Sequence, residues 1–323
     1  MRRIEMPTPY AVGPVNAYLI DAEPATLIDC GIDTVEARNA LLLGLTANGY
    51  FPQSIEQVLV THAHPDHYGL VPLVQQLSGA RVLFPEKEIM RVRDQQMLFE
   101  VGRLLLAAGM PLELLFKMDQ QRRRDPHARP LDHDEVVPVR DGDTFSFTAS
   151  IDGRDVDFEL EAHHMPGHTG GHMVYLEPAS GTLFAGDQLL PGVSPNPLLE
   201  PSVDEPGERR RSLKEYVASL EEMATWELSV VYPGHGDPVA EPKALIARTL
   251  AHHERRKGQV AARLGDEPRT PYEIALELYP RVSGYDSFLA VSEVVAHLDL
   301  VVDDGLAEVV EEDGVVRYRR ARC

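Results

Sequence analysis

Four side chains that can bind a metal follow one short apolar run of this 323-residue chain. They are His62, His64, Asp66 and His67, and they lie within the stretch VLVTHAHPDHYG, residues 58–69. The β-branched run predicts a strand that ends here, and the residues after it predict the start of a helix. Polar groups beside a buried strand need partners, because unpaired polar groups near a core are destabilising. The rest of the sequence therefore decides whether these groups meet a metal ion.

Three further candidate ligands stand in glycine-rich turns after or between predicted strands. They are His168 in MPGHTGGH, Asp187 in FAGDQ and His235 in YPGHGDP. Loops held by a rigid sheet are where convergent ligands are usually found. Neutral imidazoles and carboxylates suit zinc, and two ions about 3.5–4 Å apart can share a bridging carboxylate and hold a hydroxide. A dinuclear site is predicted, because this set of ligands exceeds what one tetrahedral zinc uses.

The order of strand-like and helix-like segments predicts a layered α/β fold. Two apolar runs at 15–20 and 25–31 are separated by DAEP, which is a hairpin signal. Helices are expected over 34–48, 68–77, near 208–224 and over 241–264, and further strands over 55–60, 81–85, 144–149, 155–165, 172–177, 181–187 and 228–236.

Residues 86–125 differ in character and are expected to form an apolar helical insertion between strands. Such Met- and Leu-rich helices are often plain core, but their place between strands equally favours a lid. Both interpretations stay open. The testable hypothesis is that the insertion, including Leu115 and Met118, forms part of the substrate wall. The apolar residues are Met97, Leu98, Val101, Leu104, Leu105, Met110, Leu114, Leu115 and Met118, and the segment closes with arginines at 122–124.

The C-terminal residues restart the pattern. Helices are expected at 271–279 and near 287–303, followed by two strands with Asp313 and Gly314 at the turn. Helix, helix and hairpin make the outline of a winged helix. We therefore expect a catalytic domain over 1–255 and a winged-helix-like domain over 259–323. The apolar residues of the second helix suit burial, so this domain is expected to pack on the catalytic domain or on a second subunit.

Composition limits the partners of the chain. The 51 acidic against 31 basic residues give a formal charge of -20, which repels phosphate backbones and does not attract anionic membranes. Residues 283–304, where a DNA-reading helix would lie, contain no Lys or Arg, so DNA binding is not expected and RNA is disfavoured. Cys30 and Cys323 offer no disulfide framework, and no window is long enough to span a membrane. A cytoplasmic protein is expected, and a homo-oligomer remains open.

The seven candidate ligands, in their order and loop contexts, resemble the five motifs of the metallo-β-lactamase superfamily. The resemblance implies a four-layer αββα sandwich with two metal ions, zinc or other divalent ions. It implies that His62, His64 and His168 hold the first ion, that Asp66, His67 and His235 hold the second, and that Asp187 bridges both. A bridging hydroxide would then attack the substrate, with Asp66 and Asp187 as the catalytic carboxylates.

His64 stands where the di-iron, oxygen-reducing branch of this superfamily has a glutamate, so hydrolysis is favoured over redox chemistry. With its winged-helix-like tail, the chain resembles the β-lactamase-like-protein-2 branch. Three functions remain: hydrolysis of a small ester, thioester or lactone; an endoribonuclease or phosphodiesterase; and a DNA-binding regulator. The acidic charge favours the first and leaves the nuclease as the alternative.

Other residues near the motifs are not expected to be metal ligands. Asp29 in LIDCG matches a superfamily strand whose aspartate supports the metal loop, although strand-end turns often carry such a carboxylate. Five histidines are expected to surround the ligands or to be solvated rather than to bind a metal. They are His163, His164, His172, His252 and His253.

Overall fold

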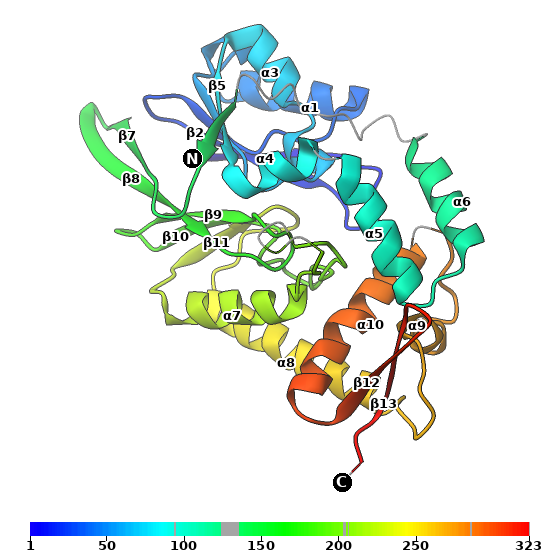
Figure 1. The fold of residues 1–323 in the computed structure, drawn as a ribbon. Helices are drawn as coiled ribbons and strands as arrows, with labels where there is room; N and C mark the ends of the chain where they lie inside the picture. Colours follow the sequence, from blue (N-terminus) through cyan, green and yellow to red (C-terminus); the bar gives the residue numbers. More distant parts are fainter. Residues whose placement is uncertain (94, 124–135, 203–204, 206, 285, 323) are drawn as a thin grey trace.

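Two β-sheets form the centre of the molecule (Figure 1). The structure is a computed structural model that describes residues 1–323 except 94, 124–135, 203, 204, 206, 285 and 323, and it does not describe the side chains of 90–93, 95–98 and 121–123. The first sheet contains, in spatial order, β1 (Arg2–Met6), β2 (Val15–Ile20), β3 (Thr26–Ile28), β4 (Gln57–Leu59), β5 (Arg81–Pro85) and β6 (Val136–Val139). The second contains β11 (Val230–Pro233), β10 (Thr182–Gly186), β9 (Met173–Glu177), β8 (Arg154–His164) and β7 (Thr144–Ile151).

The pairing directions place several strand ends at one edge. In the first sheet β3, β4, β5 and β6 run parallel, whereas β1, β2 and β3 pair antiparallel. In the second sheet β10 and β11 are parallel, and β7 to β10 pair antiparallel. Parallel strands end on the same side of a sheet, so the loops after β10 and β11 leave the second sheet at one edge, and those after β3, β4 and β5 leave the first sheet at one edge.

Helices cover the outer face of each sheet. The helices on the first sheet are α1 (Val35–Ala47), α2 (Pro65–Tyr68) and α3 (Val71–Ser78), with a short 3-10 turn at Pro52–Ser54. The helices on the second sheet are α7 (Ser212–Thr225) and α8 (Pro242–Ala261), drawn below the sheets in Figure 1. This order of helix, sheet, sheet and helix is the expected αββα architecture, and the α/β fold class is confirmed.

The alternation of side chains along the strands explains the layers. On β2, Val15, Ala17 and Leu19 pack toward α1 and α3, whereas Tyr18 and Ile20 pack into the space between the sheets. Every residue of β2 is therefore buried, and its one amide, Asn16, donates hydrogen bonds to Pro233 O and Gly236 O.

One expected helix is interrupted. The sequence predicted a helix over 68–77, but α2 ends at Tyr68 and α3 begins at Val71. The backbone between them bonds elsewhere: Cys30 N donates to His67 O at 2.8 Å, and Leu70 N donates to Gly31 O at 3.0 Å. These bonds join α2 and the residue after Gly69 to the turn after β3. His67 O and Leu70 N are therefore not available for the backbone hydrogen bonds of a continuous helix. The strand β1, which the sequence analysis did not identify, pairs along β2.

The insertion between β5 and β6 consists of α4 (Glu86–Arg93), α5 (Gln95–Ala107) and α6 (Leu112–Arg123). The described apolar side chains of α5 and α6 share one core with the C-terminal helices, including Leu105, Met118, Ile274 and Val291. This packing favours the core interpretation, because Met118 is buried in that core. Arg124, with the side chains of Met97, Leu98, Arg122 and Arg123, lies outside the described residues.

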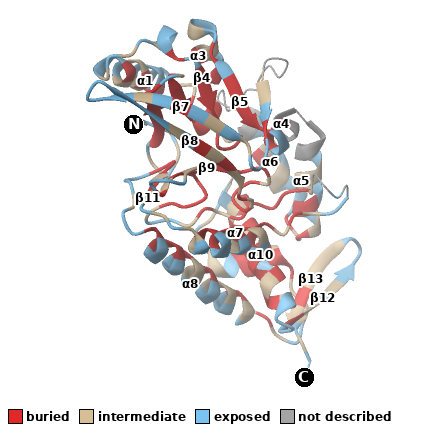
Figure 2. Cartoon of the chain, turned by 90° about the vertical axis from the view of Figure 1, so that its left-hand side faces the viewer, coloured by how far each residue is buried: buried red, intermediate tan, exposed pale blue. Residues whose placement is uncertain are grey.

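The C-terminal segment follows the predicted order. It contains α9 (Pro271–Leu278), α10 (Asp286–Asp303) and the hairpin of β12 (Ala307–Glu312) and β13 (Val315–Arg320). Asp313 and Gly314 have φ angles of 52° and 75°, as a two-residue hairpin turn requires. Helix α8 runs through residues 255–259, so the expected domain boundary falls inside a helix. Helix α10 is largely buried, as Figure 2 shows.

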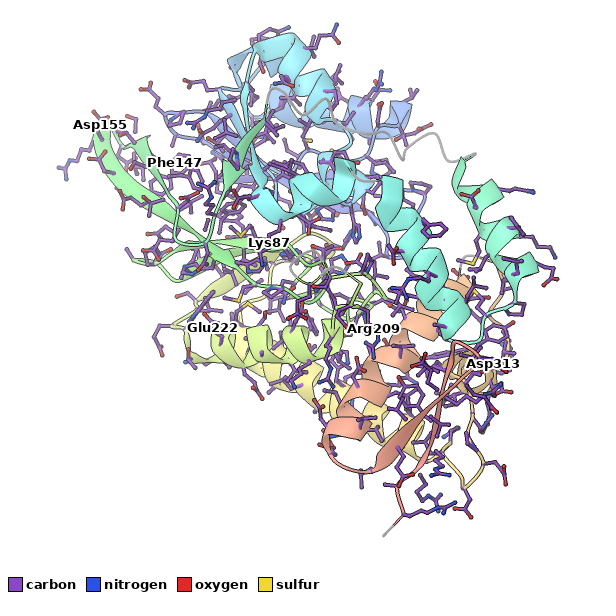
Figure 3. All side chains as sticks on the ribbon, viewed as in Figure 1. Lys87, Phe147, Asp155, Arg209, Glu222 and Asp313 are labelled. Carbon is purple, nitrogen blue, oxygen red and sulfur yellow. The ribbon has the colours of Figure 1, made fainter. Side chains whose placement is uncertain are left out.

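Ion pairs join the C-terminal segment to the residues around α7. Arg209 forms a bidentate pair with Asp299 of α10, and Figure 3 shows Arg209 beside that helix. Arg211 and Lys214 both reach Asp303, at 2.8 and 3.0 Å. Among the described residues, no helix is long and apolar enough to cross a membrane.

The shared core predicts how two adjacent leucines of α5 differ. Leu105 is 2% exposed and Leu106 is 41% exposed. Leu105→Ala should lower the free energy of unfolding by about 2–5 kcal/mol, because it removes buried contacts and leaves a cavity. Leu106→Ala, the matched control on the same helix, should change it by less than about 1 kcal/mol. Urea denaturation measures both, and equally small changes would show that α5 is not core.

Candidate metal centre

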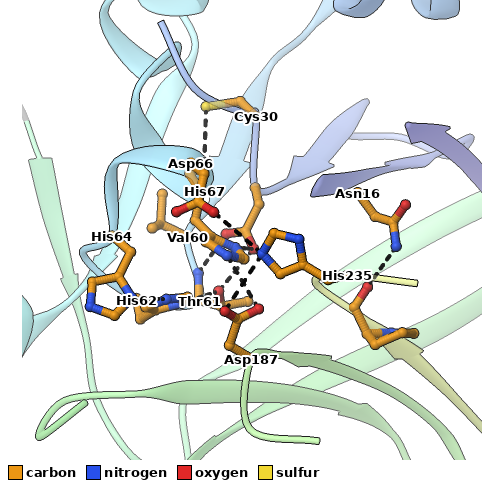
Figure 4. Close-up of polar contacts among 12 residues, drawn as sticks. Asn16, Cys30, Val60, Thr61, His62, His64, Asp66, His67, Asp187 and His235 are labelled. Carbon is orange, nitrogen blue, oxygen red and sulfur yellow. Dashed lines mark hydrogen bonds and ion pairs between the residues drawn. The ribbon is translucent and has the colours of Figure 1, made fainter. Parts of the chain in front are cut away.

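All seven predicted ligands lie close together. Figure 4 labels all of them except His168. Each comes from a loop or short helix directly after a strand. His62 and His64 follow β4, Asp66 and His67 lie in α2, His168 follows β8, Asp187 follows β10 and His235 follows β11.

Three imidazoles form the first group. His62 Nε2 and His168 Nε2 each lie 3.0 Å from His64 Nδ1. Each neutral imidazole has one N–H and one lone pair, so at this meeting point the single nitrogen His64 Nδ1 would have to serve two partners. Their convergence therefore fits a shared cation.

The second group consists of Asp66, His67 and His235, whose ligand atoms lie within 4.8 Å of one another. His235 Nε2 is 3.3 Å from Asp66 Oδ2, and His67 Nε2 is 3.3 Å from Asp187 Oδ1. Asp187 reaches both groups: its Oδ2 lies 3.6 Å from His168 Nε2 and 3.7 Å from His235 Nε2. The geometry thus places one carboxylate between two sets of three side chains.

A buried carboxylate behind the site fixes two of the imidazoles. Asp29 accepts hydrogen bonds from Thr61 N and Thr61 Oγ1, both at 2.8 Å, and from His67 Nδ1 at 2.7 Å. His67 therefore carries a proton on Nδ1 and directs its Nε2 toward the site. Because Thr61 gives its only hydroxyl proton to Asp29, its oxygen accepts from His62 Nδ1 at 3.0 Å. The His62 Nε2 lone pair is thereby left facing the first group.

A backbone carbonyl fixes a third imidazole. His235 Nδ1 lies 2.8 Å from Pro14 O, an atom that can only accept. The proton therefore sits on Nδ1 and the lone pair on Nε2. Hydrogen-bonded partners behind a metal-binding histidine commonly set its tautomer in this way.

The charges of the site favour a cation. Burial and the neighbouring imidazoles hold the pKa of His62 well below its ordinary value, so this ring is neutral. Burial alone would lower the pKa of His67, but the charges of Asp187 and Asp29 outweigh it and hold the pKa well above its ordinary value. Burial alone would raise the pKa of Asp187, yet His67, His235 and His168 hold it below its usual range. The carboxylates of Asp187 and Asp29 thus stabilise positive charge at the site.

Three buried atoms test whether a metal fits. His67 Nε2, His235 Nε2 and Asp187 Oδ1 are buried and make no hydrogen bond to the described residues. Unpaired buried polar atoms are costly, and a divalent cation would satisfy all three at once. The donor set of imidazole nitrogens and carboxylate oxygens suits zinc and similar ions.

Close backbone approach makes one glycine necessary. A Cβ atom at Gly234 would collide with Asp187 Oδ1 and would lie 2.6 Å from His67 Cε1. Any side chain there would displace the carboxylate between the two groups. The glycine of YPGHGDP thus lets the His235 loop pass directly over Asp187.

The remaining motif histidines lie around the site or away from it. His172 is buried, its Nε2 accepts from Asp187 N at 3.2 Å, and its ring stacks on His62. His164 Nε2 lies 2.9 Å from Gly170 O, and His163 pairs with Glu161. His252 and His253 lie on α8.

Glu88 is a residue of the site that the sequence analysis missed. This buried carboxylate of α4 accepts from Ala63 N at 3.2 Å, Thr169 Oγ1 at 2.5 Å and Gly171 N at 2.7 Å. It therefore joins the loop of His62 and His64 to the loop of His168. No motif surrounds Glu88 in the sequence, and its helix reads as an ordinary amphipathic segment. Only its place between the two loops reveals it.

Comparisons with known proteins agree with the geometry. The family model described as the metallo-β-lactamase superfamily matches residues 10–235. The chain is similar to the "Probable metallo-hydrolase YqjP" of Bacillus subtilis (strain 168), with 33% identity over 303 residues, 92% of this chain and 91% of that protein. It is also similar to the crystal structure of the metallo-β-lactamase family protein TTHA1429 from Thermus thermophilus, with a TM-score of 0.79, 32% identity and coverage of 98% and 97%.

A more distant relative carries a named activity. The atrochrysone carboxyl ACP thioesterase AgnL7 of Paecilomyces divaricatus is 27% identical over 210 residues, which cover 64% of this chain and 59% of that protein. The family match, the fold and the converging His and Asp side chains agree. The chain belongs to the metallo-β-lactamase superfamily and is a metal-dependent hydrolase.

Proposed function

We propose that the chain is a dinuclear hydrolase that cleaves a small ester, thioester or lactone. The observation that carries the proposal is the position of Asp187, whose Oδ2 lies 3.6 and 3.7 Å from imidazoles of two separate ligand groups. In this assignment His62, His64 and His168 hold one ion, Asp66, His67 and His235 hold the other, and Asp187 contacts both. Zinc is the expected metal, since imidazole and carboxylate ligands suit it.

When bound, two such ions would polarise the scissile carbonyl and lower the pKa of a water molecule. The protein contributes orientation. Asp29, Thr61 and Pro14 O hold three imidazoles with their Nε2 lone pairs toward the centre. Asp66, whose Oδ2 lies 3.3 Å from His235 Nε2, is the carboxylate that we assign to return a proton to the leaving group. Serine or cysteine nucleophiles are not required by this mechanism.

Glu88 acts as a positioning residue in this proposal. Its three hydrogen bonds hold the backbone of Ala63, between two ligands of the first group, against the backbone that follows the third ligand. Arg210 also contacts this loop. It lies against Gly170 and pairs with Glu200 at 2.8 Å and with Glu215. Glu88 therefore restricts the distance between the His168 loop and the loop of His62 and His64, and Arg210 adds a contact to Gly170.

The substrate class is proposed from charge and similarity. A formal charge of -20 opposes a polyanionic substrate such as RNA. A relative over 64% of this chain is named a thioesterase, which supports an acyl substrate. Endoribonuclease or phosphodiesterase activity is the alternative, and it rests on the resemblance to the β-lactamase-like-protein-2 branch.

The C-terminal segment, residues 259–323, is proposed as a winged-helix-like domain that supports the catalytic domain, residues 1–255. Its helix α10 packs on α7, α8 and α9, and its buried residues include Val291, Val294 and Leu298. A helix buried in this way has few side chains left for a DNA groove. The ion pairs of Arg209 and Arg211 with α10 hold the two parts together.

The dinuclear assignment predicts the metal content. Protein reconstituted with zinc and freed of excess ions should bind close to two equivalents by elemental analysis. Asp187→Ala should weaken both sites roughly 100-fold or more and abolish most hydrolysis, because one carboxylate serves both groups. Asp237→Ala, which removes an exposed carboxylate, is the control. A wild-type content that stays at one equivalent would contradict the dinuclear site.

Glu88 is tested against its neighbour on the same helix. Glu88→Gln should lower zinc affinity roughly 10–100-fold in chelator competition, because the loops that carry the first group lose their common anchor. Glu86→Gln removes an exposed carboxylate that pairs with Arg140, and it should leave zinc affinity unchanged. If Glu88→Gln only lowers the melting temperature of metal-free protein, the residue has a purely structural role.

The substrate class is tested by a screen of zinc-loaded protein. Thioesters, lactones, small esters, phosphodiesters and short RNA are compared by kcat/KM, with Asp187→Ala as the background. We expect turnover of an acyl substrate, because the centre polarises a carbonyl and the charge repels RNA. Faster cleavage of RNA or phosphodiesters than of every acyl substrate would overturn the proposal in favour of the alternative.

A further inference from the structure

A cavity of about 650 Å³ lies between the loop after Asp187, helix α8 and the first half of α10. This volume is typical of a small-molecule site. None of the seven candidate metal ligands lines it. The cavity is nevertheless close to the metal centre: Leu190 lines it only three residues after Asp187, which limits their Cα separation to about 11 Å. Pro191 also lies against Gly236 of the His235 loop.

One wall of the cavity is basic. Arg248, His252, Arg255 and Arg256 line it from α8, at spacings that place them on one face of the helix. Arg248 and Arg255 are exposed, and no ion pair is found for either among the described residues. In a strongly acidic chain this is a local concentration of positive charge.

The opposite wall carries the acidic residues Asp286 and Glu293 of α10. Burial raises the pKa of Glu293 to about 7, against the opposing effect of Arg256. This carboxyl is therefore partly protonated near neutral pH, and the arginines dominate the charge of the cavity.

Two buried atoms in the cavity wall have no hydrogen-bond partner in the part of the chain that the structure describes. Asn196 Nδ2 donates to Leu289 O at 3.0 Å, which fixes the amide and leaves Asn196 Oδ1 without a donor. Arg256 Nε also lacks an acceptor, since the nearest carboxylate oxygen, on Glu293, is 3.7 Å away. A hydroxyl or amide donor of a ligand would satisfy Asn196 Oδ1, and an anionic ligand suits the positive charge of Arg256 and the other arginines.

A chain of hydrogen bonds determines whether the Ser194 hydroxyl can donate to a ligand in the cavity. His297 Nδ1 must donate to Glu293 O at 2.7 Å, so its Nε2 accepts from His253 Nδ1 at 3.3 Å. His253 Nε2 is then the acceptor for Ser194 Oγ at 2.7 Å. Burial holds the pKa of His253 at about 3 and of His297 at about 4, so both rings are neutral. Ser194 therefore offers the cavity only its lone pairs.

The same chain argues against a metal at this place. His252, His253 and Glu293 come close enough to hold an ion. However, His253 has its proton directed to His297 and its lone pair directed to Ser194, so neither nitrogen is free to bind a metal. An organic anion fits these groups better than a cation does.

We propose that this cavity binds a small phosphate monoester with hydroxyl groups. The phosphate lies between Arg248 and Arg255, and the hydroxyls donate to Asn196 Oδ1 and Ser194 Oγ. The ligand is either a separate molecule or the phosphorylated end of a substrate whose reacting bond lies at the metal centre. The site itself does not depend on the proposed acyl chemistry.

Isothermal titration of the zinc-loaded wild-type protein with glucose 6-phosphate tests the proposal. Glucose and inorganic phosphate serve as comparison ligands. We expect glucose 6-phosphate to bind more tightly than either, since it alone has both groups. The double variant Arg248→Gln, Arg255→Gln should weaken binding roughly tenfold or more, because charge-assisted hydrogen bonds are lost.

A matched double variant controls for net charge. Arg81→Gln with Arg154→Gln removes two exposed arginines elsewhere, and it should leave the affinity unchanged. Equal affinity in wild-type and Arg248→Gln, Arg255→Gln protein would place the phosphate at the metals and overturn the proposal. The proposal would also be overturned if neither phosphate nor glucose 6-phosphate bound at millimolar concentrations. Neither result would bear on the acyl hydrolysis itself.

Once a substrate is known, kinetics distinguish the two sources of the ligand. Glucose 6-phosphate that raises KM at constant kcat marks the cavity as the place of the phosphorylated end of the substrate. Unchanged KM with binding intact marks a separate ligand. The binding proposal stands in either case.

Discussion

The metal centre depends on one buried carboxylate, Asp29. A carboxylate that is 2% exposed needs several donors, and Asp29 finds three in Thr61 and His67. Because it takes the only hydroxyl proton of Thr61, it also determines the tautomer of His62, which it does not touch. One residue at the end of β3 thus orients a ligand of each group. Its φ angle of 56° is unusual for a residue other than glycine, and the three hydrogen bonds support that conformation.

The layered fold turns this local arrangement into a site. The parallel strands β10 and β11 deliver the Asp187 and His235 loops to one edge of the second sheet, where they meet the His62 loop that follows β4 of the first sheet. Helix α8 begins directly beyond the His235 loop. The backbones approach so closely that Gly234 has no room for a Cβ atom. Glu88 and Arg210 both contact the His168 loop, at Gly171 and Gly170. The ligands therefore rest on a rigid support, which is what a preorganised metal centre requires.

The insertion and the C-terminal segment form a second centre of packing. Residues of α5, α6, α9 and α10 share one hydrophobic core, separate from the three cores of the sandwich. Segments distant in sequence thus stabilise each other, and α8 continues from the sandwich into this core. The cavity between α8 and α10 lies at that junction, which is a common place for a ligand site.

The sequence alone sufficed to predict the seven candidate ligands and most of the helices and strands. The candidate ligands could be recognised because they stand in short motifs; they are His62, His64, Asp66, His67, His168, Asp187 and His235. Most strands and helices could be predicted because their periods follow local sequence patterns. The tertiary structure decided everything that depends on distant contacts. The break at Gly69 comes from hydrogen bonds to the turn after β3, and β1 exists because β2 offers it a partner. The core role of the insertion and the anchoring by Glu88 arise the same way, since local patterns cannot show which distant segment a side chain will meet.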